Sequence, residues 1–197
     1  MQVRAVGAAL LGLSLVTFVA ACDDDGSRVE SGPASSTSTT SRRTECLAGA
    51  RTTEQHRAAA APAPPVALLT AVRSGAHGCF DRIVFDFRET PPGFTVGYQP
   101  GPFYRGESGQ PLSIPGSSFL VVRLAPAAGI DLSQPDARPT YTGDRVITPP
   151  GLAHVRQIVN TEDFEAQMVW VIGVDGTRPF VVKAISDPTR VYVDIGS

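Results

Sequence analysis

The stretch from Phe80 to Arg88 constrains the fold more than any other part of the chain, because β-branched and aromatic residues are dense along it. Its side chains alternate between an apolar set and a charged set: Ile83, Phe85 and Phe87 against Arg82, Asp86 and Arg88. In an extended chain these two sets fall on opposite faces. A Pro-Pro-Gly turn at residues 91–93 closes the segment. The pattern predicts a β-strand with one face buried in a core.

The rest of residues 66–197 also consists of short apolar segments, separated by Gly, Pro and Asp residues that are typical of turns. Residues 152–159 fit either a short strand or one to two helical turns. Met168, Trp170 and Ile172 lie on one face of the strand predicted over residues 164–174. The other predicted strands cover residues 66–72, 80–88, 94–98, 118–124, 180–185 and 190–195. This spacing predicts an all-β domain, a two-sheet antiparallel β-sandwich.

The N-terminus carries the features of an export signal. Arg4 precedes an uncharged, mostly apolar run over residues 5–20, which is shorter than the roughly 20 residues that a membrane span needs. The run ends in Val19-Ala20-Ala21-Cys22, which resembles the lipobox of bacterial lipoproteins. We therefore expect a signal peptide over residues 1–21 and lipidation of Cys22. The alternative is an ordinary secretory signal that is cleaved elsewhere.

A low-complexity tether is predicted over residues 22–65. It contains a Ser/Thr run at residues 34–41 and an Ala/Pro run at residues 58–65, which have little apolar surface to bury. The whole chain has a formal charge of −2 and no concentrated basic stripe, which argues against a nucleic-acid partner. The expected arrangement is a folded domain outside the cytoplasm, held to the membrane by the lipid.

Two cysteines remain once Cys22 is assigned to the lipid, namely Cys46 and Cys79. In an exported protein such a pair predicts a disulfide, which would join the end of the tether to the start of the first long strand. Two free thiols or a redox pair are the alternatives, but the spacing is not the C-x-x-C of redox sites.

The residue types needed for catalysis are present without a catalytic pattern. The three histidines, His56, His77 and His154, have no metal-ligand spacing, and no G-x-S-x-G motif occurs. Carboxylate pairs suited to glycoside hydrolysis are the one alternative: Glu162, Asp163 and Glu165, or Asp81 and Asp86. We expect a protein without enzymatic activity, cofactor or metal.

One loop offers a candidate binding site. The segment over residues 98–106 holds Tyr98, Phe103, Tyr104 and Arg105 between prolines and glycines. Aromatic rings of this kind stack on sugar faces, and an arginine pairs with a peptide carboxylate. The alternative is that Phe103 or Tyr104 simply fills the end of the sandwich.

Several phrases together resemble the AMIN-like domain of bacterial cell-surface lipoproteins, which is related to the AMIN domain of peptidoglycan amidases. The phrases occupy residues 71–85, 92–98, 163–165, 170–174 and 190–194, and the resemblance covers residues 66–197. It implies a compact β-sandwich, export, and a role in binding or localisation, with peptidoglycan as a possible ligand. It brings no catalytic residues. A protein-interaction adaptor in an envelope complex and a small glycan hydrolase are the alternative functions.

Overall fold

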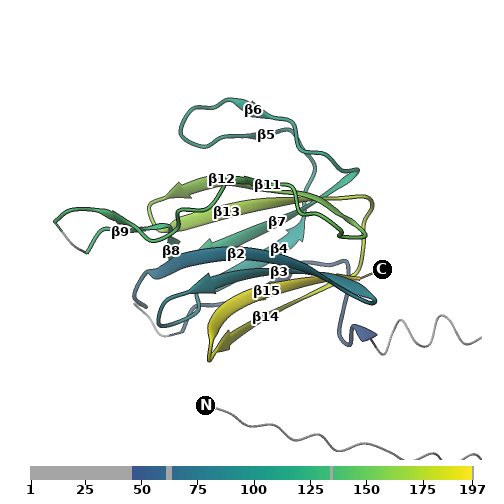
Figure 1. Cartoon of the computed structure of the whole chain (residues 1–197), viewed down its shortest axis with the longest axis horizontal. Coiled ribbons are helices and arrows are strands. Elements are labelled where there is room, and N and C mark those ends of the chain that lie inside the picture. The colour runs from purple at the N-terminus through teal and green to yellow at the C-terminus, as the bar shows by residue number, and fades with distance from the viewer. Residues whose placement is uncertain (1–45, 61–63, 134, 197) are drawn as a thin grey trace, which may run out of the picture. The chain divides into compact units, whose positions relative to one another are not determined.

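The chain folds into two main antiparallel sheets that face each other (Figure 1). The computed structural model describes residues 46–60, 64–133 and 135–196, so the predicted signal peptide, Cys22 and residues 23–45 lie outside the described residues. No helix among the residues described is long and apolar enough to cross a membrane. The strands of the six-stranded sheet are β1 (Gln55–Arg57), β4 (Gly93–Tyr98), β7 (Ser118–Ala125), β13 (Gln167–Val174), β12 (Val155–Phe164) and β11 (Val146–Ile147), in spatial order.

The second main sheet has five strands. Its central strand, β3 (Phe80–Phe87), is the one with the strongest sequence pattern. In spatial order the strands are β14 (Phe180–Ser186), β15 (Thr189–Gly196), β3 (Phe80–Phe87), β2 (Ala67–His77) and β8 (Ala127–Ala128). All of its pairings are antiparallel except β2 with β8. Two small ribbons project from the sandwich: β5 (Phe103–Tyr104) with β6 (Pro111–Leu112), and β9 (Ile130–Asp131) with β10 (Arg138–Pro139).

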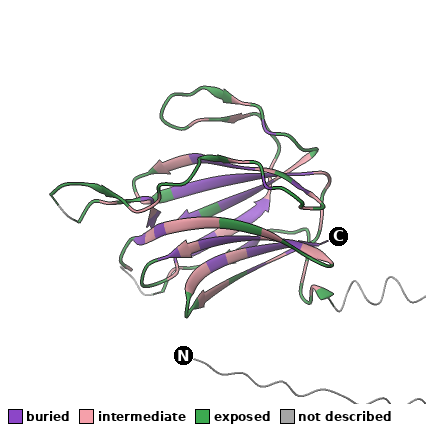
Figure 2. Ribbon diagram, in the orientation of Figure 1, coloured by how far each residue is buried: buried purple, intermediate pink, exposed green. Residues whose placement is uncertain are grey.

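The main core lies between the two sheets, where the buried residues concentrate (Figure 2). Ile83, Phe85 and Phe87 of β3 point into it, as their alternation predicts. From the facing sheet come Met168, Trp170 and Ile172 of β13. The Phe85 and Trp170 rings meet at a centroid distance of 5.7 Å, so the inward faces of β3 and β13 pack directly against each other.

A smaller apolar cluster covers the outer face of the six-stranded sheet. Val121, Val159 and Val171 are cross-strand neighbours there, and each alternates with residues that face the main core. Phe103 of β5 and Leu112 of β6 pack onto this cluster, so the β5–β6 ribbon acts as its cover. The ribbon lies above β12 and β13 in Figure 1.

The all-β, two-sheet prediction is confirmed, and the structure corrects it in detail. Residues 152–159 do not form helical turns, because β12 begins at Val155 as a strand. The single strand expected over residues 164–174 is wrong at its start, since Phe164 ends β12 and β13 begins at Gln167. Glu165 and Ala166 form the turn between them with φ of 49° and 57°. Such a turn usually contains Asn or Gly, so its sequence gave no signal.

The folded part also begins earlier than residue 66, the start expected for the sandwich domain. Strand β1 pairs with β4, and Arg51 forms an isolated bridge with Phe180 at the edge of β14. The Gln55 side chain donates to the Phe180 carbonyl and accepts from the Val182 N–H, as a neighbouring strand would. Cys46 and Cys79 form the predicted disulfide, which fixes the start of this segment.

Candidate functional site

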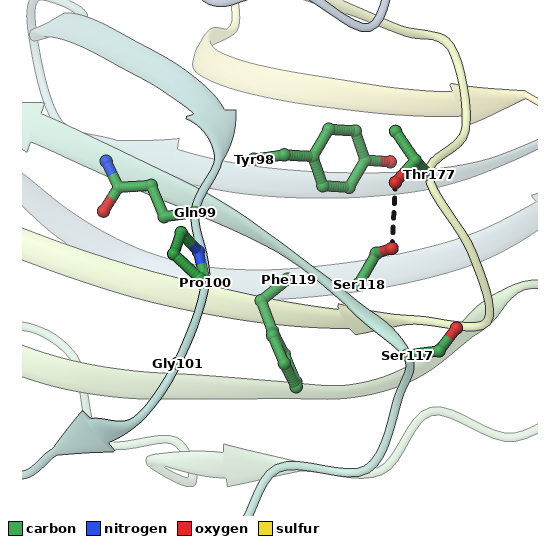
Figure 3. Close-up of a pocket in the computed structure, with 8 residues that line it drawn as sticks. All are labelled: Tyr98, Gln99, Pro100, Gly101, Ser117, Ser118, Phe119 and Thr177. Carbon is green, nitrogen blue, oxygen red and sulfur yellow. Dashed lines mark hydrogen bonds between the residues drawn. The ribbon is translucent and has the colours of Figure 1, made fainter.

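A notch opens at one end of the sandwich, where the chain leaving β4 and the chain entering β7 diverge. The bond from the Gln99 N–H to the Phe119 carbonyl, 3.0 Å long, holds the two segments together just beyond the strand pairing. The notch measures about 400 Å³ and is shown in Figure 3. Its lining residues come from three segments: Tyr98, Gln99, Pro100 and Gly101; Ser117, Ser118 and Phe119; and Thr177.

Tyr98 fixes the first wall of the notch. Its ring packs edge-on against Phe180 at a centroid distance of 5.8 Å. Its hydroxyl donates to the Arg178 carbonyl and accepts from the Arg178 N–H, both at 2.9 Å. Burial raises the pKa of this hydroxyl, against the opposing effect of the Arg178 contacts. The hydroxyl is thus already paired with both backbone groups of one residue, and it ties Thr177 and Arg178 to the end of β4.

A glycine sets the position of the second wall. A Cβ at Gly173 would overlap the Pro115 carbonyl oxygen, so only glycine lets the segment before β7 lie against β13. The Ser117 N–H then donates to the Val174 carbonyl at 2.8 Å. The segment that precedes β7 is therefore hydrogen-bonded to the end of β13.

The interior of the notch combines an aromatic ring with neutral polar groups. Phe119 presents its ring to the notch and is supported from the side by Phe103, edge-on at 5.2 Å. The Gln99 side-chain oxygen accepts from an Arg123 guanidinium at 3.0 Å. The Ser118 and Thr177 hydroxyls share a hydrogen bond of 3.0 Å, drawn in Figure 3.

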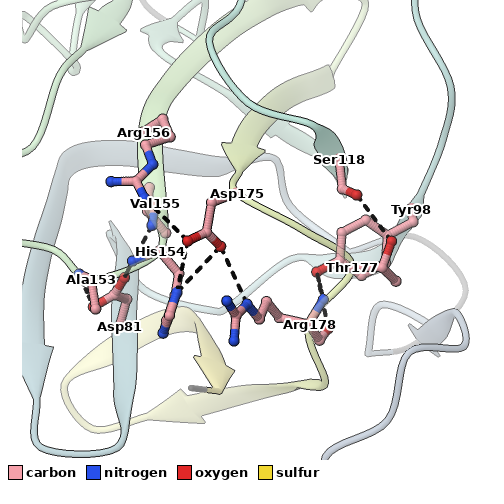
Figure 4. Close-up of polar contacts among 10 residues, drawn as sticks. All are labelled: Asp81, Tyr98, Ser118, Ala153, His154, Val155, Arg156, Asp175, Thr177 and Arg178. Carbon is pink, nitrogen blue, oxygen red and sulfur yellow. Dashed lines mark hydrogen bonds and ion pairs between the residues drawn. The ribbon is translucent and has the colours of Figure 1, made fainter.

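Two carboxylates brace this end of the sandwich from within (Figure 4). Asp81, only 1% exposed, accepts from the N–H groups of three successive residues, Ala153, His154 and Val155, at 2.7–3.1 Å. Asp175 accepts from His154, Arg156 and Arg178 at 3.1–3.2 Å. Burial of Asp175 acts to raise the pKa of its carboxyl, but the His154 and Arg178 contacts outweigh it, and the pKa lies below its usual range.

The structure does not gather the four residues predicted as a binding site into one cluster. Tyr98 lines the notch, while Phe103 contributes only by supporting Phe119. Tyr104 is 52% exposed and points away on the β5–β6 ribbon, where it pairs with Pro111. The Arg105 backbone closes the ribbon turn through bonds with Gln110 and Gly109. The second aromatic residue of the lining is Phe119, from β7.

The candidate metal and acid residues are also dispersed. His56 contacts Thr95, His77 stacks on Phe80, and His154 contacts Asp175. Across the described ranges no group of three or more His, Cys, Asp or Glu side chains could hold a metal ion.

The carboxylate pairs considered for hydrolysis do not face each other. Asp81 is buried in the backbone cradle of residues 153–155, whereas Asp86 lies on the outer face with Arg73 at 2.6 Å. Asp163 accepts from the Gly129 N–H, and burial raises the pKa of its carboxyl. Neighbouring Glu162 alternates with Asp163 along β12, so their side chains point to opposite faces.

A second hollow lies at the other end of the sandwich, beyond the end of β7. It measures about 450 Å³ and runs between residues 65–68 and residues 130–133. Leu132 is 74% exposed, and Val66 and Ile130 are also exposed. Glu89 and Asp131 add two carboxylates to this otherwise apolar groove.

The loop predicted over residues 98–106 contains the first four residues that line the notch, but sequence reasoning missed the other four: Ser117, Ser118, Phe119 and Thr177. Ser117 and Thr177 each follow a glycine and have the sequence character of turn residues, while Ser118 and Phe119 belong to the strand predicted over residues 118–124. Only the tertiary fold brings residue 177 beside residue 118, through pairing of β13 with β7.

The family comparison agrees with the sequence resemblance. The model of the AMIN-like domain matches residues 67–197, which span the sandwich from β2 to the end of β15. No curated protein and no solved structure matches the chain. A domain of this type is a non-catalytic module related to amidase-associated peptidoglycan-binding domains. The domain and the disulfide together indicate a location outside the cytoplasm. With the match covering well over half of its residues, the chain belongs to the AMIN-like family.

Proposed function

We propose that this protein is a non-enzymatic binding module of the cell envelope, and that its ligand is peptidoglycan. The observation that carries the proposal is the family match over the whole sandwich, because related modules bind peptidoglycan beside amidases. The notch gives the module a concave, partly aromatic surface on which a wall polymer can dock. The dispersed carboxylates support a binding role over a hydrolytic one, since a glycosidase needs two carboxyl groups across one bond.

We also propose that Cys22 is lipidated and anchors the module to the membrane. The support is the sequence Val19-Ala20-Ala21-Cys22 at the end of the apolar signal. Two or three acyl chains on one residue give stable anchoring, because each buried CH₂ contributes about 0.8 kcal/mol. Expression of the Cys22→Ser variant should move the protein from the membrane fraction to the soluble fraction. A variant that remains in the membrane fraction would contradict the lipid anchor.

Sedimentation with insoluble cell-wall sacculi tests the binding proposal. Full-length protein purified in mild detergent is mixed with sacculi and centrifuged, with cellulose particles as the control polymer. We expect the protein in the sacculus pellet and not in the cellulose pellet. Recovery in the supernatant in both cases would reject peptidoglycan as the ligand.

The apolar groove favours a second candidate function, a protein-interaction adaptor. Exposed apolar groups around a hollow are typical of surfaces that bind another protein. Crosslinking in intact cells would test it, with wild type compared with the Val66→Ser and Leu132→Ser double variant. A crosslinked envelope protein that disappears in the variant would support the adaptor function, and an unchanged pattern would remove it.

A further inference from the structure

We propose that the notch between β4 and β7 binds a neutral N-acetylated sugar unit, and that it does not bind the charged peptide stem of the wall polymer. This inference rests on the proposed function and specifies which part of peptidoglycan is recognised. Its ligand-contacting residues differ from the four predicted ones, and they are Gln99, from the predicted loop, with Ser118, Phe119 and Thr177.

The size of the notch and its aromatic ring suit a sugar. Its volume of about 400 Å³ lies within the range of roughly 300–1,000 Å³ typical of small-molecule sites. Phe119 and Pro100 supply apolar surface against which the C–H face of a pyranose can pack. Figure 3 shows the Phe119 ring and the Ser118 hydroxyl on opposite sides of the β7 chain, so a ligand across the strand end meets both kinds of group.

The hydrogen bond with Arg123 determines the orientation of the Gln99 side-chain amide. An arginine has only donors, so the Gln99 oxygen must accept from Arg123 and the Gln99 NH₂ group remains available as a donor. An N-acetyl group presents a carbonyl oxygen, which is the acceptor that such a donor needs. The Arg123 contact therefore aims the amide at a ligand of this class without placing a positive charge in the notch.

The hydroxyl pair adds both a donor and acceptors. Only one of the Ser118 and Thr177 protons is used in their shared bond, so the other proton can be donated and oxygen lone pairs remain free. Thr177 is exposed and Ser118 half-buried, so a ligand can reach both. Sugar hydroxyls both donate and accept, which matches a pair with both capacities.

The uncharged lining of the notch favours binding of the sugar over binding of the stem peptide. All eight described lining residues are uncharged. Asp81 and the Asp175 cluster are paired with backbone groups or with one another, and the Arg123 guanidinium donates to the side-chain oxygen of the lining residue Gln99. A stem peptide would have to bring carboxylate groups against lining residues that offer no ion-pair partner, and a charge that loses water without gaining a partner is strongly disfavoured.

The notch is also held in shape before any ligand arrives. The Tyr98 hydroxyl fixes the Thr177 segment, and the close approach at Gly173 fixes the Ser117 segment. A preformed site binds more tightly because less conformational entropy is lost on binding.

The test uses full-length protein in detergent and two probes: a soluble tetramer of N-acetylglucosamine, and the free stem pentapeptide. Calorimetry measures direct binding, and each probe is then tested as a competitor for sacculi. Two variants disable the notch with little change of shape. Gln99→Glu keeps the Arg123 contact but replaces the donor, and Thr177→Val keeps the volume but removes the hydroxyl. Thr142→Val, an exposed hydroxyl outside the notch, is the matched control.

We expect the tetramer to bind and to displace the protein from sacculi, and the pentapeptide to do neither. Each notch variant should weaken tetramer binding by about five- to ten-fold, as expected for one lost hydrogen bond, while Thr142→Val matches wild type. Tetramer binding that is equal in all variants would overturn the notch as the site. Competition by the pentapeptide alone would overturn the sugar assignment while leaving peptidoglycan binding intact. A protein that ignores sacculi altogether would instead reject the proposed function.

Discussion

The two ends of the sandwich are built from the same strands but present different surface chemistry. At the notch, where β7 begins, the carboxylate of Asp81 is buried and paired with backbone, and the lining is uncharged, with aromatic, proline, amide and hydroxyl groups. At the groove, beyond the end of β7, Val66, Ile130 and Leu132 are exposed beside the carboxylates of Glu89 and Asp131. Figure 1 shows the β9 ribbon of the groove end projecting away from the body of the two sheets.

The difference between the two ends follows from the side-chain hydrogen bonds and ion pairs that fix the loops at each end. Asp81 satisfies the N–H groups where the chain enters β12, and Asp175 joins His154 to Arg178, so the loops at the notch are fixed by buried or half-buried polar contacts. At the groove end the base of the β9–β10 ribbon is held by the Gly129 N–H, which donates to Asp163, while the Arg138–Asp136 pair of the ribbon is exposed. A rigid neutral notch suits a small polar ligand, while an exposed apolar ribbon suits a protein surface.

The largest expected effect follows from removing the buried brace. Asp81→Ala leaves three N–H groups without their acceptor, which should lower the free energy of unfolding by about 3 kcal/mol or more. Asp136→Ala at the groove end removes only an exposed ion pair and should cost less than about 0.5 kcal/mol. Urea denaturation of both variants measures the contrast. Equal costs would show that the two ends are held in the same way.

A smaller loss is expected from the hydroxyl that joins β4 to residue 178. Tyr98→Phe removes two hydrogen bonds and leaves the half-buried Arg178 backbone without them, at a cost of about 1–2 kcal/mol. Tyr141→Phe is the control, because its hydroxyl donates once, to the Asp144 carbonyl on an exposed turn. Thermal melting of the two variants should rank Tyr98 above Tyr141. The reverse ranking would mean that the Tyr98 contact does not brace the notch.

The two ends should respond to acid in opposite directions. The pKa of Asp175 is below the ordinary 3.8, so its contribution to stability is present above that value and is lost as the pH falls through the lower folded pKa. Burial raises the pKa of Asp163 above 3.8, so this carboxyl favours the folded state in acid and that contribution is lost as the pH rises through the folded pKa.

Unfolding titrations of two variants measure these signs. Asp175→Asn should be less stable than wild type near neutral pH, with the deficit shrinking in strong acid. Asp163→Asn, whose amide oxygen can still accept from Gly129, should gain stability near neutral pH, and that gain should shrink in acid. If the stability difference from wild type changed with pH in the same direction for both variants, the proposed electrostatic contrast between the two ends would be wrong.

The smallest effect on stability is expected at the groove. Leu132→Ser changes a side chain that is 74% exposed, so the free energy of unfolding should stay within about 0.5 kcal/mol of wild type. If the notch binds the wall, retention on sacculi should also be unchanged. Loss of retention in this variant would move the wall-binding site from the notch to the groove.

The sequence predicted the strands whose patterns are local. Alternation identified the core faces of β3 and β13, and the strands predicted over residues 180–185 and 190–195 correspond to β14 and β15. It failed at the Glu165–Ala166 turn, which lacks Asn or Gly, and at β1, whose three residues carry no apolar alternation. Those two elements depend on partners elsewhere in the chain.

The candidate site shows the same division. Tyr98 of the aromatic loop lines the notch, but the rings at positions 103 and 104 are turned onto the outer sheet face and into solvent. Phe119 and Thr177 complete the notch from segments that are distant in the sequence, and neither residue type signals binding on its own.

The amino-acid sequence by itself determined the all-β class, the inward faces of the long strands and the family, because side-chain alternation and turn residues act over a few positions. The tertiary structure alone decided that residues 98–101, 117–119 and 177 meet. Their meeting depends on the register of β7 between β4 and β13, on the close approach allowed at Gly173, and on the Tyr98 hydroxyl bonds. These are long-range packing contacts, which no local pattern encodes.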